Sequence, residues 1–149
     1  TLVVFNFDAA PVSRTVALNE ILPQNARGKF VVFEFREQKF LGILGLRDTV
    51  SLNIRSHGAR VLRIAPWPGD RPVLLGTSLH LTGGACELRD VRVNADSLSG
   101  RVATRWDFPV TIHVAFPDKS GALIGHAAAS ASAPDFVVTR GSARPLGRS

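Results

Sequence analysis

The sequence DTVSLNIRSHGARVLRIAP, residues 48–66, alternates apolar and polar side chains over most of its length. Apolar residues at every second position from Val50 to Ile54 share one face of an extended chain. The break Ser56-His57-Gly58 follows, and the apolar pattern resumes at Val61. Side chains of a strand point alternately to its two faces, so a period of two residues indicates a half-buried strand. We therefore predict two strands joined as a β-hairpin.

The same period recurs further along the chain, at residues 75–81, 88–93 and 110–116, with one slip near Asp90. Residues 30–35 differ because they are apolar on both faces apart from Glu34, which predicts a central strand covered on both sides. Glycine and proline interrupt the chain at intervals of about 8 to 12 residues, the spacing typical of a sandwich or barrel. These patterns predict an all-β fold, a two-sheet antiparallel β-sandwich forming a single domain.

Residues 15–21 could form a short helix, but their β-branched side chains and Pro23 favour a strand that ends in a turn. The Ala/Ser-rich segment 127–134 reads as a loop or as the beginning of disorder, before a last strand at 136–139. We therefore expect the sandwich to span residues 1–139 and residues 140–149 to form a disordered basic tail. Methionine is absent and the chain opens at Thr1, so we expect a processed chain or an excised fragment.

Charge and composition argue against several classes of partner. The net charge is +6, but half of it comes from three arginines that follow the last acidic residue, Asp135. No basic run is interleaved with aromatic residues, so we expect no nucleic-acid partner. No run of about 18 apolar residues occurs, so we expect no membrane span. Cys86 is the single cysteine, which excludes an internal disulfide and a cysteine-rich zinc site.

The polar residues do not form a recognisable catalytic or metal-binding motif, and we expect no catalytic residue, no metal and no cofactor. Aspartates 48, 70, 96, 107 and 118 fall in predicted turns, where Asp commonly bonds to nearby backbone. Glu34 interrupts an apolar strand and needs a partner, for which Arg36, two residues on, lies on the same face. His80 and His113 read as exposed or hydrogen-bonded strand residues. Cys86 reads as a small buried hydrophobe.

Two tryptophans carry a possible binding signal. Trp67 lies in the turn Pro66-Trp67-Pro68-Gly69, and Trp106 lies at a strand end. Aromatic faces at the edges of sandwiches can stack on sugar rings, so Trp67, Trp106 and the polar-face residue His80 are the candidate carbohydrate-binding residues. The alternative is that each tryptophan caps one end of the core.

The chain resembles a known family in several runs of residues. These are FEF at 33–35, KFLG at 39–42, VSL at 50–52, SHGARVLRI at 56–64, RPVLLGTSLHLTGG at 71–84 and ELRDV at 87–91. Together they resemble the C-terminal β-sandwich of the alpha-galactosidase/melibiase clan of glycoside hydrolases, over about residues 1–117. In that family this domain begins with a strand such as residues 3–7. Two features depart from the family pattern: Arg36 stands where relatives often carry an aromatic residue, and the part from residue 120 onward has no counterpart.

The resemblance implies a non-catalytic accessory domain. The family's catalytic carboxylates belong to a TIM barrel that precedes the sandwich, so no catalytic residue carries over to this chain. The implied role is to pack on that barrel and stabilise it, which predicts an apolar patch on the surface. Carbohydrate binding by an exposed tryptophan is the alternative function, and an independent enzyme would need a pocket with convergent polar groups.

Overall fold

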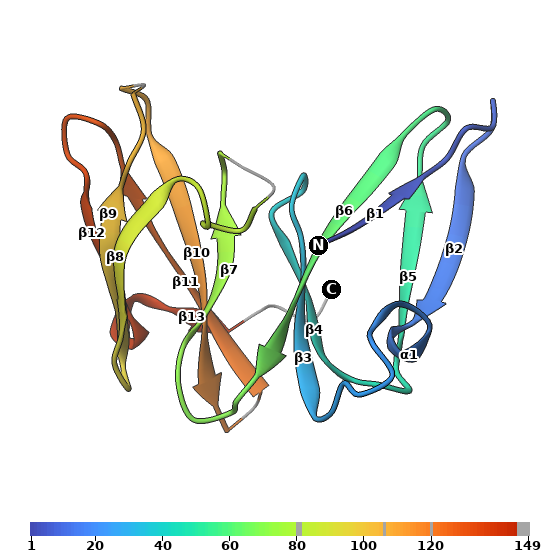
Figure 1. The fold of residues 1–149 in the computed structure, drawn as a ribbon, viewed down its shortest axis with the longest axis horizontal. Coiled ribbons are helices and arrows are strands. Elements are labelled where there is room, and N and C mark those ends of the chain that lie inside the picture. The colour runs from blue at the N-terminus through green and yellow to red at the C-terminus, as the bar shows by residue number, and fades with distance from the viewer. Residues whose placement is uncertain (80–81, 106, 120, 146–149) are drawn as a thin grey trace. The chain divides into compact units, whose positions relative to one another are not determined.

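The computed structural model describes residues 1–79, 82–105, 107–119 and 121–145. This part of the chain is almost entirely β, its strand pairs are antiparallel, and the predicted all-β sandwich class is confirmed. The sequence predicted one domain over residues 1–139. The contacts instead divide the chain into two compact units, Thr1–Trp67 and Pro68–Ser149, each with its own sheets (Figure 1).

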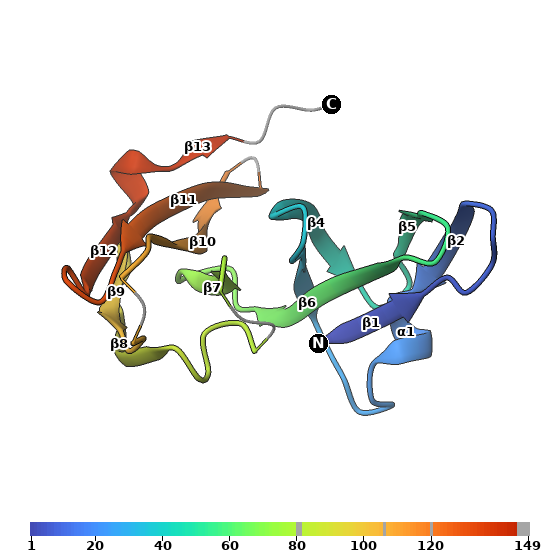
Figure 2. The same ribbon diagram turned by 90° about the horizontal axis from the view of Figure 1, so that it is seen from above.

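The N-terminal unit contains two sheets and one helical turn. Their elements are β1 (Leu2–Phe5), β2 (Val12–Ala17), α1 (Leu18–Ile21), β3 (Lys29–Glu34), β4 (Lys39–Gly45), β5 (Thr49–Ile54) and β6 (Ala59–Trp67). One sheet has the order β1-β6-β3-β4, and the other pairs β2 with β5. Figure 2 shows β1 running alongside β6 at the edge of the larger sheet. The strand favoured for residues 15–21 ends at Ala17, and a single helical turn follows.

The predicted hairpin at residues 48–66 is wrong in its pairing, although both strands form. Strand β5 pairs with β2, whereas β6 pairs with β1 and β3, so the turn at Ser56-His57-Gly58 carries the chain from one sheet to the other. Val50, Leu52 and Ile54 of β5 share a core with Leu62 of β6. Because β5 and β6 belong to different sheets, their apolar faces lie opposite each other and are buried in one core. Two strands paired in a single flat hairpin would not bury their apolar faces against each other.

Strand β3 confirms the prediction for residues 30–35. It lies between β6 and β4 in its sheet, and every residue from Phe30 to Glu34 is buried. Phe30 and Val32 belong to the core of the unit. The central position of β3 therefore fixes where Glu34 lies, at the end of the strand next to a four-residue turn.

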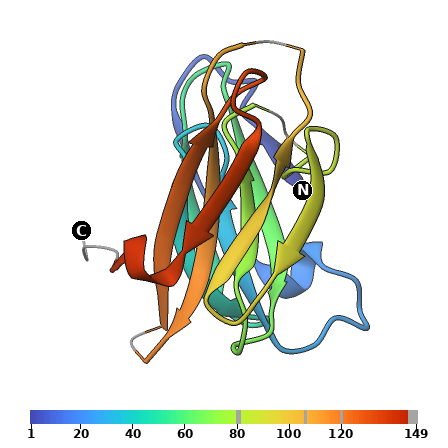
Figure 3. The same ribbon diagram turned by 90° about the vertical axis from the view of Figure 1, so that its left-hand side faces the viewer.

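The C-terminal unit is a second sandwich. Its elements are β7 (Val73–Thr77), β8 (Leu88–Val93), β9 (Ser97–Val102), β10 (Val110–Asp118), β11 (Gly121–Ala129), β12 (Asp135–Thr139), η1 (Arg140–Ser142) and β13 (Arg144–Pro145). A sheet of order β13-β11-β10-β7 faces a sheet of order β12-β9-β8, and one apolar core draws side chains from both. Figure 3 views this unit from the side of the three-stranded sheet.

Two sequence expectations can be compared with this unit. The slip near Asp90 is confirmed as an irregularity in the pairing of β8 with β9, where Asp90 has a left-handed φ of 54°. The basic tail predicted from residue 140 begins with the described residues 140–145. Arg140 forms ion pairs with Asp96 and Asp118, and β13 pairs with β11. Residues 146–149 lie outside the described part of the chain.

Candidate functional site

The three residues predicted to bind carbohydrate are only partly covered by the structure. Trp67 is the last residue of β6, opposite Lys29 of β3, and is half-buried. His80 and Trp106 lie outside the described residues. The structure therefore places one of the three residues, at a strand end rather than in the predicted turn.

The most exposed aromatic surface of the described chain lies instead on and just after β1. Phe7 is 82% exposed, Phe5 59% and Val3 38%. The rings of Phe5 and Phe7 are stacked, with centroids 5.8 Å apart and planes inclined by 16°. The alternate residues Leu2 and Val4 pack on the core of the N-terminal unit. We call Val3, Phe5 and Phe7 the aromatic edge.

Asn6 holds the aromatic edge in place. Its side chain is buried and donates hydrogen bonds to the carbonyl oxygens of Ala10 (2.9 Å) and Arg55 (3.0 Å). Its amide oxygen accepts one from the backbone N–H of Asp8 at 3.0 Å, and its own backbone N–H donates to Gly58 at 2.8 Å. Phe5 and Phe7, on either side of Asn6, are therefore presented by an ordered backbone, so covering them costs little conformational entropy of the main chain.

Sequence reasoning missed the aromatic edge although a signal was present. Residues 2–5 and 7 are apolar on both faces of an extended chain, the same pattern that predicted a doubly covered strand at residues 30–35. In β1 the structure covers only one of those faces. The second face is an apolar surface on which nothing within its own unit packs closely.

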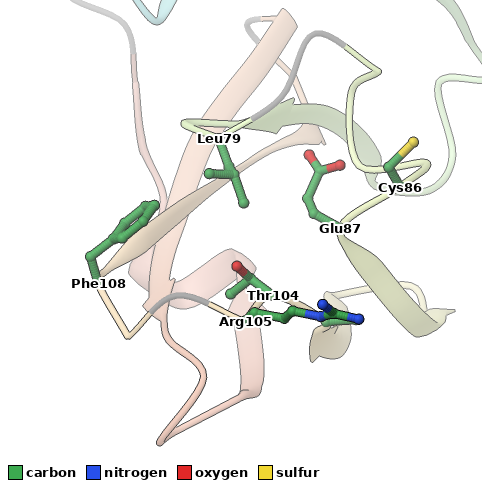
Figure 4. Close-up of a pocket in the computed structure, with 7 residues that line it drawn as sticks. Leu79, Cys86, Glu87, Thr104, Arg105 and Phe108 are labelled. Carbon is green, nitrogen blue, oxygen red and sulfur yellow. The ribbon is translucent and has the colours of Figure 1, made fainter.

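A pocket of about 830 Å³ lies in the C-terminal unit (Figure 4). Its lining includes Leu79, Glu87, Thr104, Arg105 and Phe108, and Phe108 is 44% exposed. The Glu87 carboxylate is buried and accepts hydrogen bonds from the hydroxyls of Thr77 and, at 3.1 Å, Thr82. A partly exposed aromatic ring in a pocket with charged groups is a possible surface for a sugar ring, which binds by stacking and hydrogen bonding.

The described lining of this pocket contains one carboxylate, that of Glu87. Glycoside hydrolysis uses two carboxyl groups on opposite sides of the scissile bond. Both oxygens of Glu87 are also occupied by threonine hydroxyls, which leaves this carboxylate a structural role in joining β7 to the loop before β8. The described lining of this pocket therefore does not supply the pair of carboxyl groups that glycoside hydrolysis uses.

Cys86 also lines the pocket, and its prediction as a buried hydrophobe is wrong. The cysteine is exposed. The sequence suggested that Gly83-Gly84 leads directly into a strand, but residues 82–87 form turns and β8 begins only at Leu88. Both glycines adopt left-handed φ angles, 66° and 102°. Cys86 therefore lies on a loop and lacks the strand alternation that would have directed it inward.

Glu34 is buried as predicted, but its expected partner is wrong. Its carboxylate accepts hydrogen bonds from the backbone N–H of Glu37 and, at 3.4 Å, of Val61, and lies 4.0 Å from the guanidinium of Arg60. Strand β3 ends at Glu34, and residues 35–38 form a turn. Arg36 consequently leaves the strand alternation and is exposed, while Arg60 arrives from the neighbouring strand β6.

The remaining polar predictions have mixed outcomes. Asp48 makes the predicted turn interaction, accepting a hydrogen bond from the backbone N–H of Gly45. Asp107 instead accepts hydrogen bonds from the backbone N–H and hydroxyl of Ser132, 25 residues further along the chain. The hydrogen bonds from Ser132 lower the pKa of Asp107. Of the two alternatives predicted for His113, exposed or hydrogen-bonded, the structure excludes exposure: the side chain is buried, and its burial together with the nearby His126 lowers its pKa. The two rings lie 6.4 Å apart on paired strands.

No family model, curated protein or solved structure matches the chain. Within the described ranges, no three His, Cys, Asp or Glu residues gather as metal ligands. None of the helices in those ranges is long and apolar enough to cross a membrane.

Proposed function

We propose that this chain is a non-catalytic accessory domain of a glycoside hydrolase of the alpha-galactosidase type. It packs on a catalytic TIM barrel that precedes it and stabilises that barrel. The observation that carries the proposal is the aromatic edge, because an accessory domain of this kind needs an apolar surface for the barrel to cover.

The energetics of the aromatic edge support this role. Burying a phenylalanine side chain contributes roughly 1.5 to 3 kcal/mol, and Phe5 and Phe7 retain most of their surface for a partner. Stacking fixes the two rings relative to each other before any partner arrives. The edge lies on the first strand of the chain, so a domain joined to Thr1 by a short connection could reach it without a long linker.

The double variant Phe5→Ser, Phe7→Ser tests the proposal in the longer protein that includes the region upstream of Thr1. We expect it to lower the free energy of unfolding of that protein by about 3 kcal/mol in total, because the apolar contact with the barrel is lost. The measurement is chemical denaturation, followed by circular dichroism.

The same double variant of this chain alone is the control, and its stability should change by only about 1 kcal/mol, since most of the surface of both rings is already in water. Equal effects in the two contexts would contradict the packing role. An upstream region without an eight-fold strand–helix pattern would contradict the proposed barrel.

A second function, carbohydrate binding, is favoured by the pocket around Phe108. Its exposed ring and the neighbouring Arg105 and Thr104 provide one stacking surface and several hydrogen-bonding groups. Trp106 follows Arg105 in the sequence, so a sugar titration also tests the predicted role of Trp106 in carbohydrate binding.

If the pocket binds sugar, galactose and galacto-oligosaccharides should change the intrinsic tryptophan fluorescence of the chain in a saturable manner. The variant Phe108→Ala should raise the dissociation constant obtained from that titration by roughly tenfold, since stacking on an aromatic side chain is worth about 1 kcal/mol or more. Phe7→Ala removes an exposed ring of the other unit and should leave the response unchanged. Absence of saturation with every sugar would rule this function out.

A further inference from the structure

A second, polar pocket lies in the N-terminal unit, at the end where two turns meet. The turn between β3 and β4 and the turn between β5 and β6 lie at the same end of the unit (Figure 1). Together they line a cavity of about 400 Å³ that includes Arg36, Glu37, Arg55, His57 and Arg60. Three arginines thus line one cavity beside a single carboxylate on the surface.

One of the three arginines is neutralised and held in place. The Arg60 guanidinium donates from Nε to the carbonyl oxygen of Asn53 at 2.8 Å, forms an ion pair with Glu37, and lies 4.0 Å from buried Glu34. Arg60 therefore forms a fixed wall of the cavity. Arg60 and the two glutamates together carry a net charge of −1, and Arg36 and Arg55 bring the net charge of this group to +1.

Arg36 and Arg55 are the two arginines of the cavity that form no ion pair within the described part of the chain. Both are exposed, and neither guanidinium makes a hydrogen bond or ion pair to any residue in the described ranges. Two like charges on the wall of one cavity repel each other, and an anion between them removes that repulsion. Guanidinium groups are suited to this role because their planar fork of donors matches the oxygens of sulfate, phosphate and carboxylate.

The backbone supports these two side chains from ordered turns. The Arg55 carbonyl oxygen accepts hydrogen bonds from Asn6 and from the N–H of Gly58, which closes the turn around His57. His57 itself has a left-handed φ of 49°. A Cβ on Gly58 would lie 2.9 Å from the Arg55 carbonyl oxygen, so glycine is required at that position for the turn to close. Arg55 therefore emerges from a well-defined backbone position beside the cavity.

We propose that this pocket binds a tetrahedral oxyanion, sulfate or phosphate, either free or as an ester on a larger molecule. Arg36 and Arg55 provide the charge-assisted hydrogen bonds, and Arg60, fixed by the two glutamates, provides the wall against which the anion rests. The anion site and the accessory role proposed above depend on different side chains. The experiment on one can therefore fail while the other proposal stands.

Titration calorimetry of the chain with sodium sulfate, sodium phosphate and galactose 6-sulfate, each against sodium chloride at equal ionic strength, tests this site. We expect saturable binding of at least one of the three probes. Tighter binding of the free ions identifies a free-anion site, and tighter binding of galactose 6-sulfate identifies an ester site. Loss of one charge-assisted hydrogen bond should weaken binding roughly tenfold in each of Arg36→Ala and Arg55→Ala.

Arg14→Ala is the matched control because Arg14 is an exposed arginine on β2 that does not line the cavity. It removes the same charge and should leave the affinity unchanged. The proposal is overturned if none of the three probes saturates. It is overturned equally if Arg14→Ala weakens binding as much as Arg36→Ala, because the attraction would then come from net charge alone.

Discussion

Replacing Glu34 with alanine is expected to lower the free energy of unfolding by roughly 2 to 4 kcal/mol, because two backbone N–H groups lose their acceptor and the partly buried Arg60 loses a neighbouring carboxylate. The Glu34 side chain is almost fully buried, and it satisfies the backbone N–H groups of Glu37 and Val61 while facing Arg60. Its removal leaves these donors without an acceptor at the end of a central strand. Urea denaturation followed by circular dichroism measures the loss.

Glu37→Ala is the matched control for this prediction. Glu37 pairs with the same Arg60, but its side chain is 49% exposed. Ion pairs in contact with water are worth about 1 kcal/mol or less, so this variant should lose far less stability than Glu34→Ala. Similar losses in the two variants would show that Glu34 does not have the anchoring role described here.

The second large effect is expected for Phe116→Ala, which should cost about 3 to 5 kcal/mol. Phe116 is fully buried in the core of the C-terminal unit. Its ring lies against β11, where a Cβ built on Gly125 would come within 3.1 Å of the ring. Truncation leaves a cavity between strands that already approach closely, so neighbouring side chains cannot easily fill it.

Phe108→Ala makes the same chemical change in the same unit, at a ring that is 44% exposed. Its expected cost is about 1 kcal/mol, because much of its surface is already in water. Thermal and urea unfolding of both variants provide the comparison. A cost for Phe108→Ala equal to that for Phe116→Ala would mean that the core assigned to this unit is incorrect.

The sequence predicted the positions of several strands well but predicted one of their pairings wrongly. Alternation at Val50, Leu52 and Ile54 shows which face of β5 is buried, and the structure agrees. The same alternation fits a hairpin partner in one sheet or a strand in the opposite sheet. The choice depends on which arrangement buries both apolar faces, and that requires knowing where β1, β2 and β3 lie.

Strand β11 illustrates a different limit. Its last three residues, 127–129, fall in the Ala/Ser-rich segment that read as a loop or disorder, because alanine has low strand propensity. Just before that segment, Gly125 has no room for a side chain, since a Cβ there would lie 2.9 Å from Val138. Close packing between β11 and its neighbours therefore accounts for the glycine at this position.

The candidate sites were harder to predict than the strands because they depend on contacts across turns. Arg60 reaches Glu34 from a strand that is distant in sequence, so a rule based on same-face spacing selected Arg36 instead. The exposure of Cys86 follows from turn geometry around two left-handed glycines. The aromatic edge was within reach of sequence reasoning, since residues 2–7 carry apolar side chains on both faces.

The accessory role is tested most directly by the accessibility of the aromatic edge in the longer protein. Val3 lies on this edge, so Val3→Cys in a Cys86→Ser background reports on its exposure without removing either phenylalanine. Thiol labelling of position 3, followed by mass spectrometry, is compared between this chain and the protein extended upstream of Thr1. We predict ready labelling in the chain alone and strong protection in the extended protein. Equal labelling rates in the two proteins would contradict the proposed packing on a preceding barrel.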